Sequence, residues 1–401
     1  MLALARELLA GPLRPLLDAL DVVLLPNVNA DGRDHGRRGN AHDVNLNTDY
    51  VAASQPETRA VLAALERVRP QVVLDVHESA VLKRRSLARE GYLTDFDSQF
   101  EYANNPAVPE RLRTRMADAL LPELVARVGA AGLPAQRYIG EITSVGQPIT
   151  NGGLSLRNLR NLAASDGVFA FLLETRQEPR DDPAPTPHNL AARCARSLLA
   201  QRVFLEVVHA RRAELMADVE RAHGELAKEP LGLYAAYVAD ADHPSLDLPL
   251  RERDARNRVL RHFPDHRKVA VADIVPMPAT YVLNAPGDAL LDLLDHHHIK
   301  YERLAEPLEV PVIAERYALP AVPGGRVTVT ASTPRLLSAP HGAVFIDLVQ
   351  RHGRRVPLLL DPRSISSPFR APPFSAQLAD KVEFPVYRIH KGVVQNAAPA
   401  P

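Results

Sequence analysis

The sequence has 401 residues, which is long enough for two domains of ordinary size and too long for one small core. Its 48 Lys and Arg balance its 48 Asp and Glu, so it lacks the excess of basic charge that nucleic-acid-binding proteins normally carry. It has no run near the roughly 20 apolar residues of a membrane span. Its single cysteine, Cys194, excludes an internal disulfide and a cysteine-rich zinc site. Cys194 lies among Ala and Leu, where we expect a small core residue.

The first half of the sequence alternates helical and strand-like segments. Apolar spacing predicts helices over residues 2–20, 56–69, 110–130 and about 187–228. The first of these lacks the basic segment and the cleavage site of a signal peptide. Short apolar runs predict strands over residues 22–25, 71–77 and 168–173. Such strands, separated by helices, predict an α/β fold with a mostly parallel sheet covered by helices.

The second half of the sequence has short β-like runs separated by Pro and Gly turns. The expected strands are residues 279–283, 310–313, 326–330, 344–348 and 356–360. One helix is predicted over residues 288–296. We therefore predict a first domain over residues 1–228, a connecting segment over 229–270, and a smaller β-rich or α+β domain over 271–401.

Polar residues follow each expected strand of the first half. In open α/β sheets, functional groups collect at the carboxyl ends of the strands. His77 follows the second strand, Glu174 follows the third, and Arg38 lies in the loop after the first. A histidine, a carboxylate and an arginine that converge on one rim are suited to the roles of metal ligand, general base and oxyanion partner.

The alternation of side chains along a strand places Asp75 and His77 on one face. A carboxylate in that position orients a metal-bound imidazole. The alternative for His77 is a strand-end histidine with a satisfied hydrogen bond. Glu174 ends an apolar strand, so burial is expected to raise its pKa toward the range of a general base. Its alternative is a salt bridge to an arginine on the same rim.

Four motifs occur in one order along the first 225 residues: Asn29-Ala30-Asp31-Gly32, then Arg38-x-Asn40-x-x-Asp43-x-Asn45-Leu46-Asn47, then Leu74-Asp75-Val76-His77, then Phe171-Leu172-Leu173-Glu174-Thr175-Arg176. They resemble the zinc carboxypeptidase (M14) family. The segment of residues 56–77 also resembles the bacterial and deacylase-like branches of that family. The second half resembles, more loosely, a carboxy-terminal module of some bacterial members.

This resemblance implies zinc-dependent hydrolysis of an amide bond in a peptide or an acyl amino acid. It makes His77 a zinc ligand and Glu174 the general base that deprotonates the water and passes the proton to the leaving amine. It makes Arg38 the residue that polarises the carbonyl and holds the oxyanion. It places Asn47 and Arg176 at the substrate. A metal, a carboxylate and a guanidinium are chemically consistent with these roles.

The sequence also departs from the family pattern. The other two family zinc ligands come from an H-x-x-E motif, and no His-x-x-Glu occurs here. Catalytic zinc takes three protein ligands. We therefore expect that the first strands and two zinc ligands are missing, and that the chain begins in the helix that follows this motif. Two alternatives stay open: a catalytically silent protein that binds peptides or other ligands, and a deacylase of N-acyl amino acids.

Further substitutions affect the substrate end of the site. Thr48 stands where an arginine would clamp the terminal carboxylate in two hydrogen bonds, and Asn45 replaces an aspartate. The tyrosine that the family places just before a Gly-Gly turn is missing, since residues 147–151 before Gly152-Gly153 include none. Arg157 and Arg160 are either anion-binding or solvated helix residues. The run from His296 to His298 is predicted to end a helix, because successive helical residues point about 100° apart and cannot share one metal.

Overall fold

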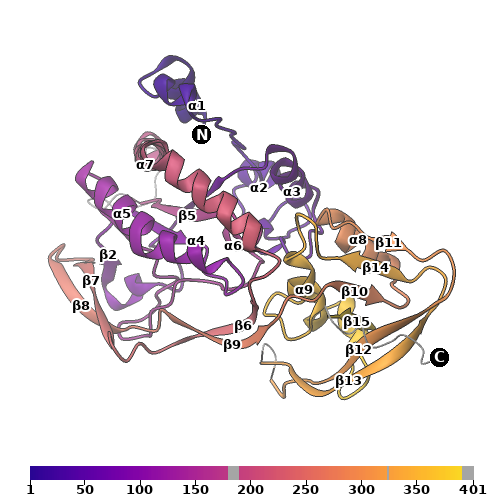
Figure 1. Cartoon of the computed structure of the whole chain (residues 1–401). Helices are drawn as coiled ribbons and strands as arrows, with labels where there is room; N and C mark the ends of the chain where they lie inside the picture. Colours follow the sequence, from indigo (N-terminus) through magenta and orange to yellow (C-terminus); the bar gives the residue numbers. More distant parts are fainter. Residues whose placement is uncertain (179–188, 323–324, 391–401) are drawn as a thin grey trace.

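The computed structural model describes residues 1–178, 189–322 and 325–390 (Figure 1). It confirms the α/β class. The central sheet has the strand order β1-β5-β3-β4, where β1 is Val72–Ser79, β5 is Phe169–Arg176, β3 is Ser98–Tyr102 and β4 is Ala135–Arg137. The β1–β5 and β3–β4 pairs are parallel, and the β3–β5 pair is antiparallel. The sheet is therefore mixed.

Helices pack against this sheet and form the first core. They are α3 (Pro56–Val68), α4 (Glu110–Arg115), α5 (Leu121–Ala130), α6 (Leu159–Ala164) and α7 (Leu190–Glu225). Proline at the first turn and Glu57 beside it favour the start of α3, since proline lacks the amide hydrogen that would stay unpaired there. The predicted helix over residues 110–130 is present, with a π-helical turn over Met116–Leu120 between α4 and α5.

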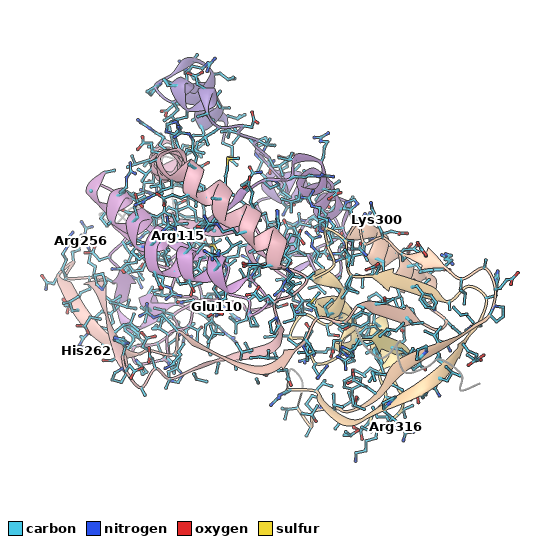
Figure 2. The ribbon with its side chains drawn as sticks, in the orientation of Figure 1. Glu110, Arg115, Arg256, His262, Lys300 and Arg316 are labelled. Atoms are coloured by element: carbon cyan, nitrogen blue, oxygen red, sulfur yellow. The ribbon has the colours of Figure 1, made fainter. Side chains whose placement is uncertain are left out.

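The long helix α7 is fixed to α4 by charged side chains as well as by apolar packing. In Figure 2, Glu110 and Arg115 mark the two ends of α4, which lies alongside α7. The Arg115 guanidinium pairs with Glu214 of α7, and its Nε lies 3.9 Å from Asp218. The backbone amide of Glu110 donates to Glu229 just beyond α7.

The predicted connecting segment forms two antiparallel strand pairs. Strand β6 (Leu231–Val238) pairs with β9 (Lys268–Val275). Strand β7 (Ser245–Glu252) pairs with β8 (Arg258–Pro264) and with the short β2 (Tyr92–Thr94). Arg256 and His262 mark the β7–β8 hairpin in Figure 2, at the opposite side of the molecule from Lys300 and Arg316.

The last part of the chain forms a six-stranded sheet with the order β11-β14-β10-β15-β12-β13. Its strands are β10 (Thr280–Leu283), β11 (Glu302–Arg303), β12 (Leu308–Ala318), β13 (Thr328–Ala339), β14 (Val344–Asp347) and β15 (Val386–Ile389). Helix α8 (Asp288–His296) has the predicted bounds. One apolar core joins this part to the first, because Tyr50, Val51 and Leu62 share a cluster with Leu290 and Leu360. The division at residues 228 and 270 stays a prediction.

Two predicted strands are wrong. Residues 356–360 belong to helix α9 (Arg355–Leu360), whose residues are all buried. An apolar run that is buried on every side carries no periodicity, so it cannot be told from a strand by pattern. Residues 22–25 form no strand, and Val23 and Leu25 are exposed. Their backbone groups pair with no described strand, and such pairing is what a strand requires.

The start of the chain forms a small helical head, α1 (Leu2–Ala10) followed by a 3-10 turn (Arg14–Asp18), in place of one helix over residues 2–20. Leu4, Leu8 and Leu13 pack against Leu198 and Leu205 of α7. Figure 1 shows the head set apart from the sheet and joined to α2 (Ala30–Asp34) by an extended stretch of chain. None of the described helices is long and apolar enough to cross a membrane.

The three adjacent histidines do not converge, as their helical spacing predicts. His297 follows α8 and is fully buried, and its Nε2 lies 2.9 Å from the carbonyl oxygen of Val51. Burial, followed by the charge of Arg355, lowers the pKa of His297 to about 3. His296 and His298 are only partly buried. His297 is thus a neutral contact between the two parts of the chain.

This histidine predicts an acid-sensitive stability. In the unfolded chain its pKa is near 6.5, so between that value and about 3 the unfolded state binds one more proton than the folded state. The free energy of unfolding is therefore expected to fall by about 1.4 kcal/mol per pH unit below pH 6.5 from this group alone. We expect His297→Gln, which keeps a donor toward Val51, to remove that slope. Urea unfolding at pH 7.5 and pH 5 measures it.

The exposed loop residue His243 gives the matched control. Its side chain is 78% exposed and contacts Asp240, so His243→Gln should leave the acid slope of the wild-type chain unchanged. Equal slopes for His297→Gln and the wild type would contradict the assignment.

Candidate functional site

His77 and Glu174 lie side by side at the carboxyl ends of two parallel strands. Strand β1 pairs with β5 in a register that sets His77 opposite Glu174, and Ser79 opposite Arg176. Paired residues of neighbouring strands project to the same face of a sheet. The structure thus brings together the imidazole and the carboxylate that the sequence analysis singled out from segments almost 100 residues apart.

Asp75 completes a charged group with His77. Its Oδ1 lies 2.9 Å from His77 Nε2, as the two-residue period of the strand predicts. Burial alone would lower the pKa of His77, but the Asp75 carboxylate, and to a smaller degree Glu174, outweigh burial and raise it to about 9. The imidazole is therefore held as a cation between two carboxylates. The contact with Asp75 also fits part of the alternative, in which His77 is a strand-end histidine whose ring nitrogen has a polar partner.

Glu174 is a carboxylate whose outer oxygen is free. Its Oε2 is buried and makes no hydrogen bond to any described residue. Burial raises the pKa of Glu174, the cationic His77 opposes this rise, and Asp75 adds to it. The salt bridge to an arginine that was the alternative is not found among the described residues. A buried carboxylate with a raised pKa and a free lone pair is suited to accept a proton from water.

The loop that carries Arg38 is held by the Asn-Ala-Asp-Gly motif. Asn29 accepts a hydrogen bond from the amide of Gly32 at 3.0 Å and donates to the carbonyl of Arg38 at 3.1 Å. A Cβ on Gly32 would lie 2.3 Å from the Asn29 amide nitrogen and 2.7 Å from the carbonyl of Gly39. Only glycine fits at that position, so the motif fixes the path of the loop.

Arg38 and Asn47 line the same cleft as Asp75 and His77. The Arg38 side chain is exposed, and its positive charge lowers the pKa of both His77 and Glu174. Asn47 lies in a short 3-10 turn (Leu46–Thr48), where its backbone amide donates to the Asn45 side chain at 3.2 Å. Its side-chain amide lines the cleft and makes no hydrogen bond to the described residues.

Thr48 and Arg176 are directed elsewhere. The Thr48 hydroxyl donates to the carbonyl of Asn45 at 3.0 Å, so it does not replace the absent arginine clamp. Arg176 is buried, and its Nη1 donates to the carbonyl of Thr94 at 2.5 Å. Arg176 is not among the residues that line the cleft, and its role at the substrate stays a prediction.

One neighbour of the site, Tyr138, was not found from the sequence. The Tyr138 ring packs on Gly152, where an added Cβ would lie 3.0 Å from Cε1. Burial, followed by the charge of Glu174, raises the pKa of Tyr138 to about 12. Arg160, which the sequence left as an anion-binding or a solvated helix residue, is not solvated: it is buried and donates to the carbonyl of Asn151 at 3.2 Å. Arg157 is exposed. These contacts join segments that are distant in the sequence, so no local pattern predicts them.

The cleft has a volume of about 1080 Å³. Strand β1, helices α3 and α7, and residues 23–29 supply most of its lining. Cys194 is one of the lining residues and is exposed. Its prediction as a core residue is wrong, because α7 turns this side toward the cleft and not toward the sheet. At the rim, Arg193 pairs with Glu78, with distances of 2.8 and 2.5 Å.

The described residues do not make a zinc site by themselves. Within residues 1–178, 189–322 and 325–390, no group of three or more His, Cys, Asp or Glu is arranged to hold a metal ion. Catalytic zinc takes three protein ligands and one open position. His77 is the only imidazole at the cleft among its lining residues, and its Nε2 faces Asp75. The donor set is therefore incomplete for that metal.

Part of the chain is similar to known fungal proteins. Probable carboxypeptidase 2 of Trichophyton verrucosum is 27% identical over 180 residues, which are 44% of this chain and 35% of that protein. Probable carboxypeptidase 2 of Arthroderma benhamiae is 28% identical over 180 residues, 44% of this chain and 34% of that protein. Carboxypeptidase 2 of Trichophyton rubrum is 26% identical over 163 residues, 40% and 30% respectively.

The chain thus spans about a third of the length of the curated relatives it matches. No protein-family model and no solved structure matches it.

Proposed function

We propose that this chain carries an amide-bond hydrolase site of the zinc carboxypeptidase (M14) type, with peptides as the substrate class. The observation that carries the proposal is the pairing of His77 with Glu174 on neighbouring strands, beside the cleft that holds Arg38 and Asn47. The similarity to fungal carboxypeptidases supports the same class. Within the family, the segment of residues 56–77 favours the bacterial, deacylase-like branch.

In this proposal each residue has one chemical task. Glu174 takes a proton from the attacking water and returns it to the leaving amine, for which its free oxygen and raised pKa are suited. The exposed guanidinium of Arg38 neutralises the charge that develops on the carbonyl oxygen. Asn47 offers its amide to the substrate, and Asp75 holds the imidazole of His77 in place.

Zinc is part of the proposal because the four sequence motifs resemble those of the zinc carboxypeptidase family. Bound beside His77, it would supply a Lewis acid that lowers the pKa of water. The described residues offer too few ligands for it, so we propose that zinc binding needs ligands from outside the described residues.

Turnover and zinc content test the proposal together. Purified chain is incubated with N-blocked dipeptides, with and without micromolar zinc, and bound zinc is measured after gel filtration. Release of the carboxy-terminal residue in proportion to bound zinc is the expected result for a complete site. No bound zinc and no release at micromolar supply would reject hydrolysis by this chain.

One observation favours a second function. The incomplete ligand set is what a catalytically silent protein that binds peptides or other ligands would show. Such a protein should bind the same dipeptides by calorimetry without cleaving them.

A deacylase of N-acyl amino acids is a variant of the first function. Thr48 does not distinguish the two, because it is engaged with Asn45 and both substrate classes carry a terminal carboxylate that it cannot clamp in two hydrogen bonds. Comparing turnover of blocked dipeptides and N-acyl amino acids separates a carboxypeptidase from a deacylase.

A further inference from the structure

Two loops meet beside Glu174, one after strand β1 and one after strand β4. The first loop carries Lys83, and the second, which begins at Tyr138, carries Glu141. The Lys83 ammonium lies 2.6 Å from Glu141 Oε1, and this ion pair joins the two loops. Neither Lys83 nor Glu141 has a task in the proposed function.

The loop after β1 is fixed at the end of β5, the strand that carries Glu174. Glu178 lies just past that end and is buried. Its carboxylate accepts hydrogen bonds from the amides of the two residues before Lys83, at 2.9 and 3.1 Å. The Ser86 hydroxyl donates to the carbonyl of Lys83 at 3.0 Å. The backbone of Lys83 is therefore held on both sides.

The loop after β4 runs over the face of the sheet from which Glu174 projects. Antiparallel pairing sets Gln99 of β3 opposite Glu174, so these two side chains lie on one face. Gln99 Oε1 accepts a hydrogen bond from the amide of Ile139 at 3.1 Å. Glu141 follows shortly after, and its carbonyl accepts from Gln147 Nε2 at 2.9 Å. The ion pair of Glu141 with the first loop therefore lies near the Glu174 carboxylate.

The side chains of this ion pair are partly exposed although the two backbones are fixed. The Lys83 side chain is 38% exposed, and that of Glu141 is 69% exposed. Exposed ion pairs contribute little free energy, so another carboxylate can replace Glu141 at small cost. A lysine ammonium has three N–H donors, and among the described residues only Glu141 accepts from Lys83. The ammonium is thus held in position and can still bind a ligand.

We propose that Lys83 binds a carboxylate group of the peptide that occupies the site, and that this carboxylate displaces Glu141 from the ammonium. Glu141 keeps the ammonium in place in the absence of a ligand. Lys83 is then a specificity-determining residue, which favours peptides with a carboxylate near the amide that meets Glu174 over neutral peptides. The inference rests on the proposed function in taking a peptide as the ligand and Glu174 as the centre of the site.

A peptide offers such a carboxylate at its carboxy terminus or on an acidic side chain. Four N-acetyl dipeptides separate these sources: Ala-Ala, Ala-Ala amide, Glu-Ala amide and Gln-Ala amide. Their dissociation constants for the purified, zinc-free chain are measured by calorimetry at low ionic strength. Tighter binding of Ala-Ala than of its amide identifies the terminal carboxylate. Tighter binding of Glu-Ala amide than of Gln-Ala amide identifies the acidic side chain, and either result supports the proposal.

The two members of the ion pair are expected to have opposite effects on binding of the preferred dipeptide. Lys83→Gln removes the ammonium and should weaken binding about tenfold. Glu141→Gln removes the competing carboxylate and should tighten binding about two- to fivefold, because no exposed ion pair then has to be broken. Lys83→Arg keeps the charge and should retain binding. An ion pair that only braces the two loops would give a loss for both Gln substitutions.

The exposed ion pair of Lys268 with Asp242 is the matched control. The two charged groups are 3.6 Å apart, and the side chains are 50% and 80% exposed. Lys268→Gln and Asp242→Asn should both leave binding of the dipeptides unchanged. Circular dichroism and the urea midpoint establish that every variant is folded.

Three outcomes would overturn the proposal. The first is equal binding of all four dipeptides, and the second is binding of none of them. The third is any result for Lys83→Gln and Glu141→Gln other than a loss and a gain. Binding is measured without zinc and without turnover. A chain that binds as expected but releases no amino acid would therefore contradict the proposed hydrolysis and leave the role of Lys83 intact.

Discussion

Glu174→Gln is expected to lower kcat for hydrolysis of a blocked dipeptide by about 10²- to 10⁴-fold, the usual contribution of a positioned general base. The amide has nearly the shape of the carboxylate but cannot take a proton from water. KM should change little, because Gln keeps the size and shape of the side chain and only the transfer of the proton is lost. Steady-state kinetics with an N-blocked dipeptide, under the zinc conditions that give turnover, measures both constants.

Glu206→Gln is the matched control for this substitution. Glu206 lies on α7 and is 3.5 Å from Arg127 in a loose, half-exposed ion pair. Its loss should leave kcat within about twofold of the wild-type value, since exposed pairs contribute little. A Glu174→Gln chain that turns over within threefold of the wild type would exclude Glu174 as the base.

Asp166→Ala is expected to destabilise the chain by about 3–5 kcal/mol, because it leaves buried cationic partners without their carboxylate. Asp166 accepts from Arg355 Nε at 3.0 Å and lies 3.1 Å from His352 Nδ1. All three side chains are buried. His352 also reaches Glu66 of α3 at 3.0 Å, so the network ties α3, the turn before β5 and α9 together. The free energy of unfolding from urea titration measures the loss.

Asp34→Ala offers a comparison at the surface. The pair of Asp34 with Arg33 has 65% and 76% exposed side chains and a distance of 3.2 Å. Its removal should change the free energy of unfolding by less than about 1 kcal/mol. If Asp166→Ala cost no more than Asp34→Ala, the buried network would not be a source of stability.

Local patterns predicted the elements that carry their own signals. Helix α3 has its proline start and helical spacing, α8 has the predicted bounds, and β1 and β5 fall on the apolar runs. Residues 356–360 and 22–25 were misassigned, because in both cases tertiary surroundings decide the outcome. The first run is buried on all sides within the core, and the second has no neighbouring described strand to pair with.

The predicted connecting segment, residues 229–270, shows a different limit of prediction from sequence patterns. Strands β8 and β9 alternate exposed and half-buried positions over most of their length, and both carry charged residues. A sheet of two or three strands with one solvated face leaves only a weak hydrophobic pattern in the sequence. Pairing over long distances, such as β2 with β7, cannot be read from either segment alone.

The candidate site likewise has a part that local patterns predict and a part that they do not. The two-residue period of β1 placed Asp75 beside His77, and parallel pairing of the strand ends brought Glu174 to the same register. Tyr138 reaches the site region from a loop that no local spacing connects to it. Arg176 is the opposite case. It lies two positions after Glu174 in the sequence, where a place at the site was predicted, but its side chain donates to the carbonyl of Thr94.

The apolar cluster that unites Tyr50, Val51 and Leu62 with Leu290 and Leu360 limits how this molecule can be taken apart. A fragment ending after α7 would present the first three of these side chains to water, and a fragment starting after β9 would do the same with the last two. Neither piece would therefore be a self-sufficient folding unit. Proteolysis between them should yield products that stay associated until denaturant is added, and a gene split at that point would need both products in one cell.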